Sequence, residues 1–255
     1  MKIEKLSLYI IACNEEKRLT KTLEAAKSLV DEIVIVDSGS TDNTKKIAEK
    51  YNAKFIFHEW HDYGTQVKFA EEQCANKWVL RLDADEILTP ELVKELAEIK
   101  LNAEYDGYKL RLCDMFPGMK RPNKLVKHFK LIRLYNRDCW TMSGEYDHDD
   151  VIKLKPDATA YTCKNLVEHH SFLSIHHTVN KYNNASDTLA KRAMAQNKNY
   201  SAWRMFGAST LEFLKIYILG RFFLLGWWGF IHCMNLAYLR FLKFSKFYEL
   251  THKKN

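Results

Sequence analysis

Apolar and polar positions follow two different periods along the first hundred residues. Short apolar runs rich in β-branched residues predict four strands, over 5–12, 32–38, 54–59 and 78–84. Apolar residues at helical spacing predict helices after each strand, with a stripe of Leu19, Leu23, Ala26 and Val30 in the first and further helices over 41–52, 65–75 and 90–100. Repeated strand and helix alternation predicts a mostly parallel sheet flanked by helices.

The helix starts carry capping signals. We expect Asn14 to cap the first helix and Thr41 or Asp42 to cap the second, while Pro90 occupies the first turn of the fourth. From 107 to 170 the pattern changes to shorter β-like pieces separated by polar loops. These pieces predict a second layer or subdomain that is mainly antiparallel.

After Ser174 the chain reads as helix almost to its end, and Ile216–Ile231 is its most apolar part. A helix of that length spans about 24 Å and contains Arg221, whereas a bilayer core is about 30 Å thick. We therefore expect it to lie in a membrane interface without crossing. A helical hairpin packed on the domain's own core, or a dimer contact, is the alternative.

Charge is concentrated at the C-terminal end. The formal net charge is +7, and residues 211–255 contain seven Lys or Arg, two Glu and 12 of the 33 aromatic residues. Arg240, Lys243 and Lys246 recur on one helical face, which favours an anionic membrane surface. No nucleic-acid-binding pattern accompanies them, so we expect no nucleic-acid partner. The six cysteines stand singly, which is typical of a reducing, cytoplasmic compartment.

Polar clusters follow three of the predicted strands, as "CNEE", "DSGSTD" and "DADE". In a parallel sheet these loops meet at the carboxyl edge, where ligands bind. Neither a dinucleotide fingerprint nor a P-loop is present. Asp83 and Asp85 offer hard oxygen ligands that suit Mg²⁺ or Mn²⁺, and the remaining ligands of such an ion are commonly phosphate oxygens. A solvated acidic loop is the alternative for this motif.

The three motifs, in this order and spacing, resemble the nucleotide-binding half of family 2 inverting glycosyltransferases, which have the GT-A fold. The resemblance implies an α/β fold with a mixed, mostly parallel sheet and a UDP-sugar donor. It implies a metal site at Asp83 and Asp85. It also implies nucleotide-sugar-binding roles for Ala12, Asn14, Glu15, Asp37, Gln66, Lys68, Asp83 and Ala84.

The second half is similar to lipopolysaccharide core glucosyltransferases that add β-1,4-glucose to an inner-core heptose, which implies a lipid-linked oligosaccharide acceptor. The segment "DHDD" implies a catalytic base at Asp149, with Asp147 and Asp150 as alternatives. His169 is implied to complete the metal shell or touch diphosphate. Lys181 is expected to neutralise a phosphate or to be a solvated lysine.

These inferences predict a nucleotide-sugar-binding half over 1–105, an acceptor-binding and catalytic half over 106–200, and amphipathic membrane-associating helices over 201–255. The predicted protein is peripheral on the inner face of the cytoplasmic membrane; its oligomeric state stays open. A haloacid-dehalogenase-like phosphatase is the rival enzyme, since its signature is also a strand followed by D-x-D, although that motif normally follows the first strand. A non-catalytic membrane-associated scaffold is the other alternative.

Overall fold

The computed structural model of the chain describes residues 1–144, 151–201 and 203–252. The chain divides into two compact units. One comprises Met1–Met115, Lys120–Pro122 and His128–Ser171, and the other Phe116–Met119, Asn123–Lys127 and Phe172–Asn255. The division differs from the expected boundaries after 105 and 200. Strands from both expected halves, 1–105 and 106–200, share one sheet, and the helix that begins at Ile175 belongs with the C-terminal helices.

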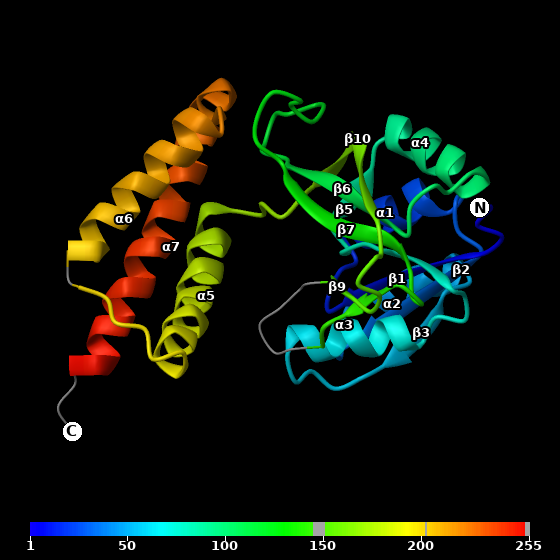
Figure 1. Ribbon diagram of the computed structural model, residues 1–255, viewed down its shortest axis with the longest axis horizontal. Coiled ribbons are helices and arrows are strands. Elements are labelled where there is room, and N and C mark those ends of the chain that lie inside the picture. Colours follow the sequence, from blue (N-terminus) through cyan, green and yellow to red (C-terminus); the bar gives the residue numbers. More distant parts are fainter. Residues whose placement is uncertain (145–150, 202, 253–255) are drawn as a thin grey trace. The chain divides into compact units, whose positions relative to one another are not determined.

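The first unit is built on an eight-stranded mixed sheet in the order β3-β2-β1-β4-β7-β6-β10-β5 (Figure 1). Its strands are β1 (Leu6–Ala12), β2 (Glu32–Asp37), β3 (Lys54–Phe57), β4 (Trp78–Arg81), β5 (Glu86–Leu88), β6 (Gly107–Asp114), β7 (Phe129–Asn136) and β10 (Ala160–His169). Strands β1 to β4 pair in parallel, and β7 joins β4 antiparallel. The predicted α/β class is confirmed.

Helices cover both faces of this sheet because the strands bury both sets of alternate side chains. Leu8 and Ile10 of β1 share a core with α1 (Leu19–Ala26), α2 (Thr44–Lys50) and α4 (Pro90–Leu101). Tyr9 faces the other core, with α3 (Tyr63–Glu72) and the small hairpin β8 (Trp140–Met142) and β9 (Val151–Lys153). The polar loops therefore remain at the strand ends.

Three sequence predictions for this unit are wrong. The N-cap of α2 is Asn43 and neither Thr41 nor Asp42. The β-like pieces after residue 106 form no separate layer, because β6, β7 and β10 continue the same sheet and β10 pairs with β6 in parallel. Asn14 does not cap α1, which begins at Leu19; Asn14 instead adopts a φ of +56° in the preceding loop. Strand β5 was not predicted, since its three residues are too few for a periodicity to register.

The second unit contains α5 (Ile175–Ala195), α6 (Trp203–Leu214), a π-helical turn over Lys215–Leu219, a 3₁₀ turn over Phe222–Leu225 and α7 (Gly226–His252). Helix α7 packs against both α5 and α6. The expected continuous helix over Ile216–Ile231 is wrong. Arg221 has a φ of +60°, and Gly226 has φ +59° and ψ −138°, a conformation open essentially to glycine.

Candidate active site

The loops after β1 and β2 are tied together, as their parallel pairing predicts. The backbone N–H of Asn14 donates to Ser40 Oγ at 2.7 Å, and the Asn14 side-chain oxygen accepts from the Thr41 N–H at 2.9 Å. One residue on, the N–H of Glu15 donates to Thr44 Oγ1 at 2.8 Å. The "CNEE" and "DSGSTD" segments thus form one polar surface next to Ala12, at the carboxyl edge of the sheet.

Asp37 holds the second loop in shape. Its carboxylate is buried, and Oδ2 accepts the backbone N–H groups of Gly39 and Ser40, both at 2.8 Å. Gly39 has a φ of +110°, which a side chain would strain. The predicted contact of Asp37 with the nucleotide stays a prediction, and the observed role of this carboxylate is to order the loop.

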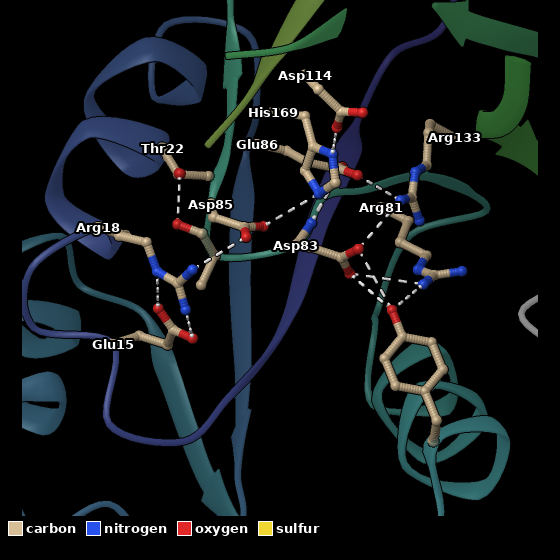
Figure 2. Close-up of polar contacts among 12 residues, drawn as sticks. Glu15, Arg18, Thr22, Arg81, Asp83, Asp85, Glu86, Asp114, Arg133 and His169 are labelled. Carbon is tan, nitrogen blue, oxygen red and sulfur yellow. Dashed lines mark hydrogen bonds and ion pairs between the residues drawn. The ribbon is translucent and has the colours of Figure 1, made fainter. Parts of the chain in front are cut away.

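Asp83 lies against two buried arginines. Arg133 Nη2 is 3.1 Å from its Oδ2 and Arg81 Nη2 is 3.5 Å from its Oδ1 (Figure 2). The Tyr63 hydroxyl donates to Oδ1 at 3.1 Å. Although burial favours the neutral acid, the Arg133 and Arg81 charges hold the pKa of Asp83 well below its usual range. Asp83 is therefore an ionised carboxylate whose oxygens already have protein partners.

Glu86 belongs to the same buried network. Its Oε1 lies 2.5 Å from Arg133 Nη2, and both side chains are almost fully buried. Burial raises the pKa of Glu86, against the neighbouring Arg133 charge. The sequence did not reveal Arg81 or Arg133 as site residues, because each stands in an apolar strand. That unusual position was itself the available signal, since a buried arginine needs an anionic partner.

Asp85 lies between a cation and an imidazole. Its Oδ2 is 3.1 Å from Arg18 Nη1, and its Oδ1 is 3.9 Å from His169 Nε2. Asp114 Oδ1 is 2.7 Å from His169 Nδ1, which leaves Nε2 facing Asp85 (Figure 2). Burial opposes the charged imidazole, but the hydrogen bond to Asp114 and the surrounding carboxylates raise the pKa of His169.

This donor set fits a divalent cation. Asp85 supplies a carboxylate oxygen and His169 an imidazole nitrogen whose ring is oriented by a second carboxylate, Asp114, an arrangement common at metal sites. Asp83 is close in sequence but is engaged by arginines. Within the described ranges, no group of three or more His, Cys, Asp or Glu side chains is arranged to hold a metal. An ion bound at Asp85 and His169 would thus take its remaining ligands from substrate or water.

Three further predicted residues of the first unit have partners within the protein. Gln66 is buried and hydrogen-bonds His58 through both ends of its amide, and the Lys68 ammonium lies 2.7 Å from Glu71 Oε2. Ala84 is buried, with its carbonyl accepting from Thr22.

Two predicted roles fall on residues outside the first unit or outside the described ranges. Lys181 is in α5, in the second unit. The proposed base Asp149 and its alternatives Asp147 and Asp150 lie outside the described residues.

The sheet and its polar edge place the protein among α/β enzymes that bind ligands beyond the carboxyl ends of their strands. The profile of the family described as Glycosyl transferase family 2 matches residues 7–153, more than half of the chain. The protein therefore belongs to glycosyltransferase family 2 and is a glycosyltransferase. The GT-A-like fold predicted from the sequence is confirmed.

Several known proteins are similar over nearly the whole chain. An uncharacterized glycosyltransferase of Rickettsia typhi is 34% identical over 260 residues, which cover 98% of this chain and 89% of that protein. The lipopolysaccharide core biosynthesis glycosyltransferase LpsC of Rhizobium meliloti is 29% identical, with 96% and 92% covered. Among solved structures, S. aureus TarS 1-349 in complex with UDP-GlcNAc aligns at a TM-score of 0.47 and 14% identity, covering 98% of this chain and 92% of that one.

Proposed function

We propose that the protein transfers glucose from UDP-glucose to a heptose of a lipopolysaccharide core acceptor, with inversion at the anomeric carbon. The Asp85–His169–Asp114 arrangement at the carboxyl edge carries the donor half of this proposal. The acceptor half is supported by the likeness to LpsC, which is named for lipopolysaccharide core biosynthesis. Membership of family 2 removes the phosphatase alternative.

Each step has an assigned residue. Asp85 and His169 would hold Mg²⁺ or Mn²⁺, which supplies positive charge to the donor diphosphate. Asp149 accepts the proton of the acceptor hydroxyl, with Asp147 and Asp150 as alternative bases. The hydroxyl oxygen forms the new bond to the anomeric carbon from the face opposite UDP, and the bond to the UDP oxygen breaks with its electrons on UDP. General-base catalysis of this kind contributes about 10²–10⁴-fold.

The donor assignment is tested with a panel of nucleotide sugars. We expect UDP with Mn²⁺ to raise the melting temperature, and UDP-glucose to be hydrolysed slowly in preference to UDP-galactose, GDP-sugars and CMP-sugars. Asp85→Asn should abolish the metal-dependent shift, whereas Asp157→Asn, which removes an exposed carboxylate, should leave it unchanged. A preference for GDP- or CMP-sugars would refute the uridine assignment, and an absent shift in the native protein would refute the donor site.

The acceptor assignment needs its own measurement. Purified lipopolysaccharide truncated after the inner-core heptoses should accept radiolabelled glucose, and the same glycolipid already carrying that glucose should not. Transfer only to a non-heptose acceptor would contradict the heptose proposal while leaving the donor assignment intact.

We further propose that the second unit binds the inner face of the cytoplasmic membrane peripherally. The turn between α6 and α7 carries exposed Leu219, Phe223 and Leu224, and it continues into exposed Trp227 at the start of α7; Leu219 is 78% and Trp227 79% exposed. Lys215 and Arg221 are exposed beside them. Apolar and cationic side chains together suit an anionic lipid interface.

A peripheral arrangement accounts for the composition of α7. By length and composition, Phe222–His252 is a candidate membrane span, since it contains an 18-residue stretch with a mean hydropathy of 1.3. Its uncharged α-helical part runs only from Gly226 to Leu239, about 21 Å, which is shorter than a bilayer core.

The predicted basic face of α7 is partly paired inside the helical unit. Lys246 lies 2.8 Å from Asp187 and Arg240 lies 3.4 Å from Glu212, so the turn is the better contact.

Vesicle binding tests the membrane proposal. We expect co-sedimentation with vesicles of anionic phospholipid, weaker binding to neutral phosphatidylcholine, and loss of binding in Trp227→Ser. Trp60→Ser is the matched control, because Trp60 is 49% exposed in the first unit. Equal binding of the two variants would contradict the assignment of the turn, and no binding by the native protein would contradict peripheral association.

A further inference from the structure

Arg18 is clamped between two carboxylates at the start of α1. Its Nε and Nη2 donate to the two carboxylate oxygens of Glu15 at 2.7 and 2.5 Å, and Nη1 donates to Asp85 Oδ2 at 3.1 Å (Figure 2). The paired geometry with Glu15 is the strongest that a guanidinium makes. Glu15 therefore anchors Arg18, while the contact with Asp85 is a single, weaker bond.

The contact matters because Asp85 is the carboxylate best placed to hold a divalent cation. One of its oxygens faces His169, and the other is neutralised by Arg18. The Asp85 side chain is only 15% exposed, so water screens this ion pair poorly. A cation arriving at Asp85 alone would meet both a carboxylate already paired and the repulsion of a guanidinium.

We propose that Arg18 is a diphosphate-binding residue that rests on Asp85 until the donor arrives. When nucleotide and divalent cation enter together, Arg18 exchanges its bond to Asp85 for one to a phosphate oxygen. Glu15 holds the guanidinium next to Asp85 throughout, so that only Nη1 exchanges its hydrogen-bond partner. The exchange restores a counter-charge to both Arg18 and Asp85. This inference rests on the proposed metal-dependent nucleotide-sugar donor.

The exchange makes the binding of metal and nucleotide cooperative. Metal alone must separate Arg18 from Asp85 without offering the guanidinium a new anion. Nucleotide diphosphate supplies that anion, and arginine binds phosphate oxygens well because its planar donors match them. By reciprocity, UDP strengthens metal binding by the same factor as metal strengthens UDP binding.

The test measures Mn²⁺ affinity by the electron paramagnetic resonance signal of free Mn²⁺, with and without UDP, in the native protein, Arg18→Gln and Lys21→Gln. Lys21→Gln removes the same charge from an exposed position of α1. We expect Arg18→Gln to bind Mn²⁺ alone about tenfold more tightly, and to lose most of the strengthening by UDP. Lys21→Gln should match the native protein in both measurements.

Identical Mn²⁺ affinities of Arg18→Gln and the native protein, with and without UDP, would overturn the inference. Should Arg18→Gln fail to fold, the arginine side-chain N–H resonances of the native protein give the second readout. The Arg18 signal, assigned with Arg18→Lys, should shift when UDP and Mg²⁺ are added together and stay fixed otherwise. A native protein that binds no UDP with metal refutes the proposed function itself; binding without any role of Arg18 refutes only this inference.

Discussion

Nδ1 of His169 lies 2.7 Å from Oδ1 of Asp114, at the paired ends of β10 and β6. The bond selects which imidazole nitrogen is available, because it directs Nε2 toward Asp85. It also joins the last residues of two parallel strands, so the ring is held by the sheet and by a carboxylate together. The imidazole of His169 is thus oriented by Asp114, a residue that the sequence motifs did not identify.

Replacing Asp114 tests this orientation. Asp114→Asn should weaken metal-dependent UDP binding about 10–100-fold, since carboxylates that orient a ligating histidine contribute on that order. Isothermal titration with UDP and Mn²⁺ measures it. His170→Gln alters the neighbouring histidine, which pairs with Glu168, and should change the affinity little. Unchanged binding in Asp114→Asn would contradict the role of this pair.

Arg133 should be essential for stability. Arg133→Met leaves Glu86 fully buried without its cation, and breaking such a pair typically costs about 3–5 kcal/mol of unfolding free energy. Urea denaturation measures the loss. Lys130→Met, at an exposed position on the same strand, is the control. The double variant with Glu86→Gln should recover part of the stability; no recovery would mean that the unpaired Glu86 carboxylate is not the cause of the loss.

Glu71 is a second buried carboxylate with a structural role. It accepts hydrogen bonds from Tyr135, Lys68, Thr141 and the Met142 backbone, all between 2.7 and 3.0 Å. In Glu71→Gln the amide would present donors to Lys68 and Thr141. We expect a loss of about 3 kcal/mol.

Chemical denaturation of Glu71→Gln beside Glu72→Gln measures that loss. Glu72 is 56% exposed, so its variant should lose less than about 0.5 kcal/mol. Equal losses would show that the Glu71 network does not stabilise the fold.

The lowered pKa of Asp31 makes the free energy of unfolding depend on pH. Burial opposes its ionisation, but hydrogen bonds from Lys100 and the Leu6 backbone lower the pKa of Asp31 in the folded protein. Its contribution is therefore present above the unfolded value of about 3.9 and lost as the pH falls through the folded value. Asp31→Asn should cost about 0.5 kcal/mol at pH 7, reduced by solvent screening because the carboxylate is 38% exposed.

Urea melts of the native protein and Asp31→Asn at pH 7, 5, 4 and 3 follow this change. The difference between them should stay constant down to pH 5 and shrink below about pH 4. Asp157→Asn, at an exposed position, should show no such trend. A difference that grows in acid would mean that the pKa shift has the opposite sign.

The sequence was sufficient for the first four strands, because their apolar runs are long and their helices amphipathic. Parallel pairing then required the loops at Asn14 and Ser40 to meet, as they do. Only the family resemblance suggested that Asp85 and His169 lie together. No local sequence pattern connects the turn before β5 with the end of β10.

The sequence did not predict contacts between residues far apart in the chain or the backbone conformations of single residues. Arg81 and Arg133 interrupt apolar strands, and only the folded sheet reveals that both face Asp83. The helix break after Gly220 depends on the left-handed conformation of Arg221, which no propensity favours. Apolar periodicity continues across that point, so the pattern predicted a longer helix than the backbone allows.

The strand order has a geometrical consequence for the Asp-x-Asp turn. β4 and β5 stand four strand spacings apart in the order of the sheet, about 19 Å if the sheet were flat. Only residues 82–85 connect them, a reach of at most about 17 Å. The sheet must therefore curl so that its edge strand β5 comes back toward the central strand β4, and the Asp-x-Asp turn connects these two strands directly. Shortening this connection by one residue would reduce its reach and require a tighter curl of the sheet.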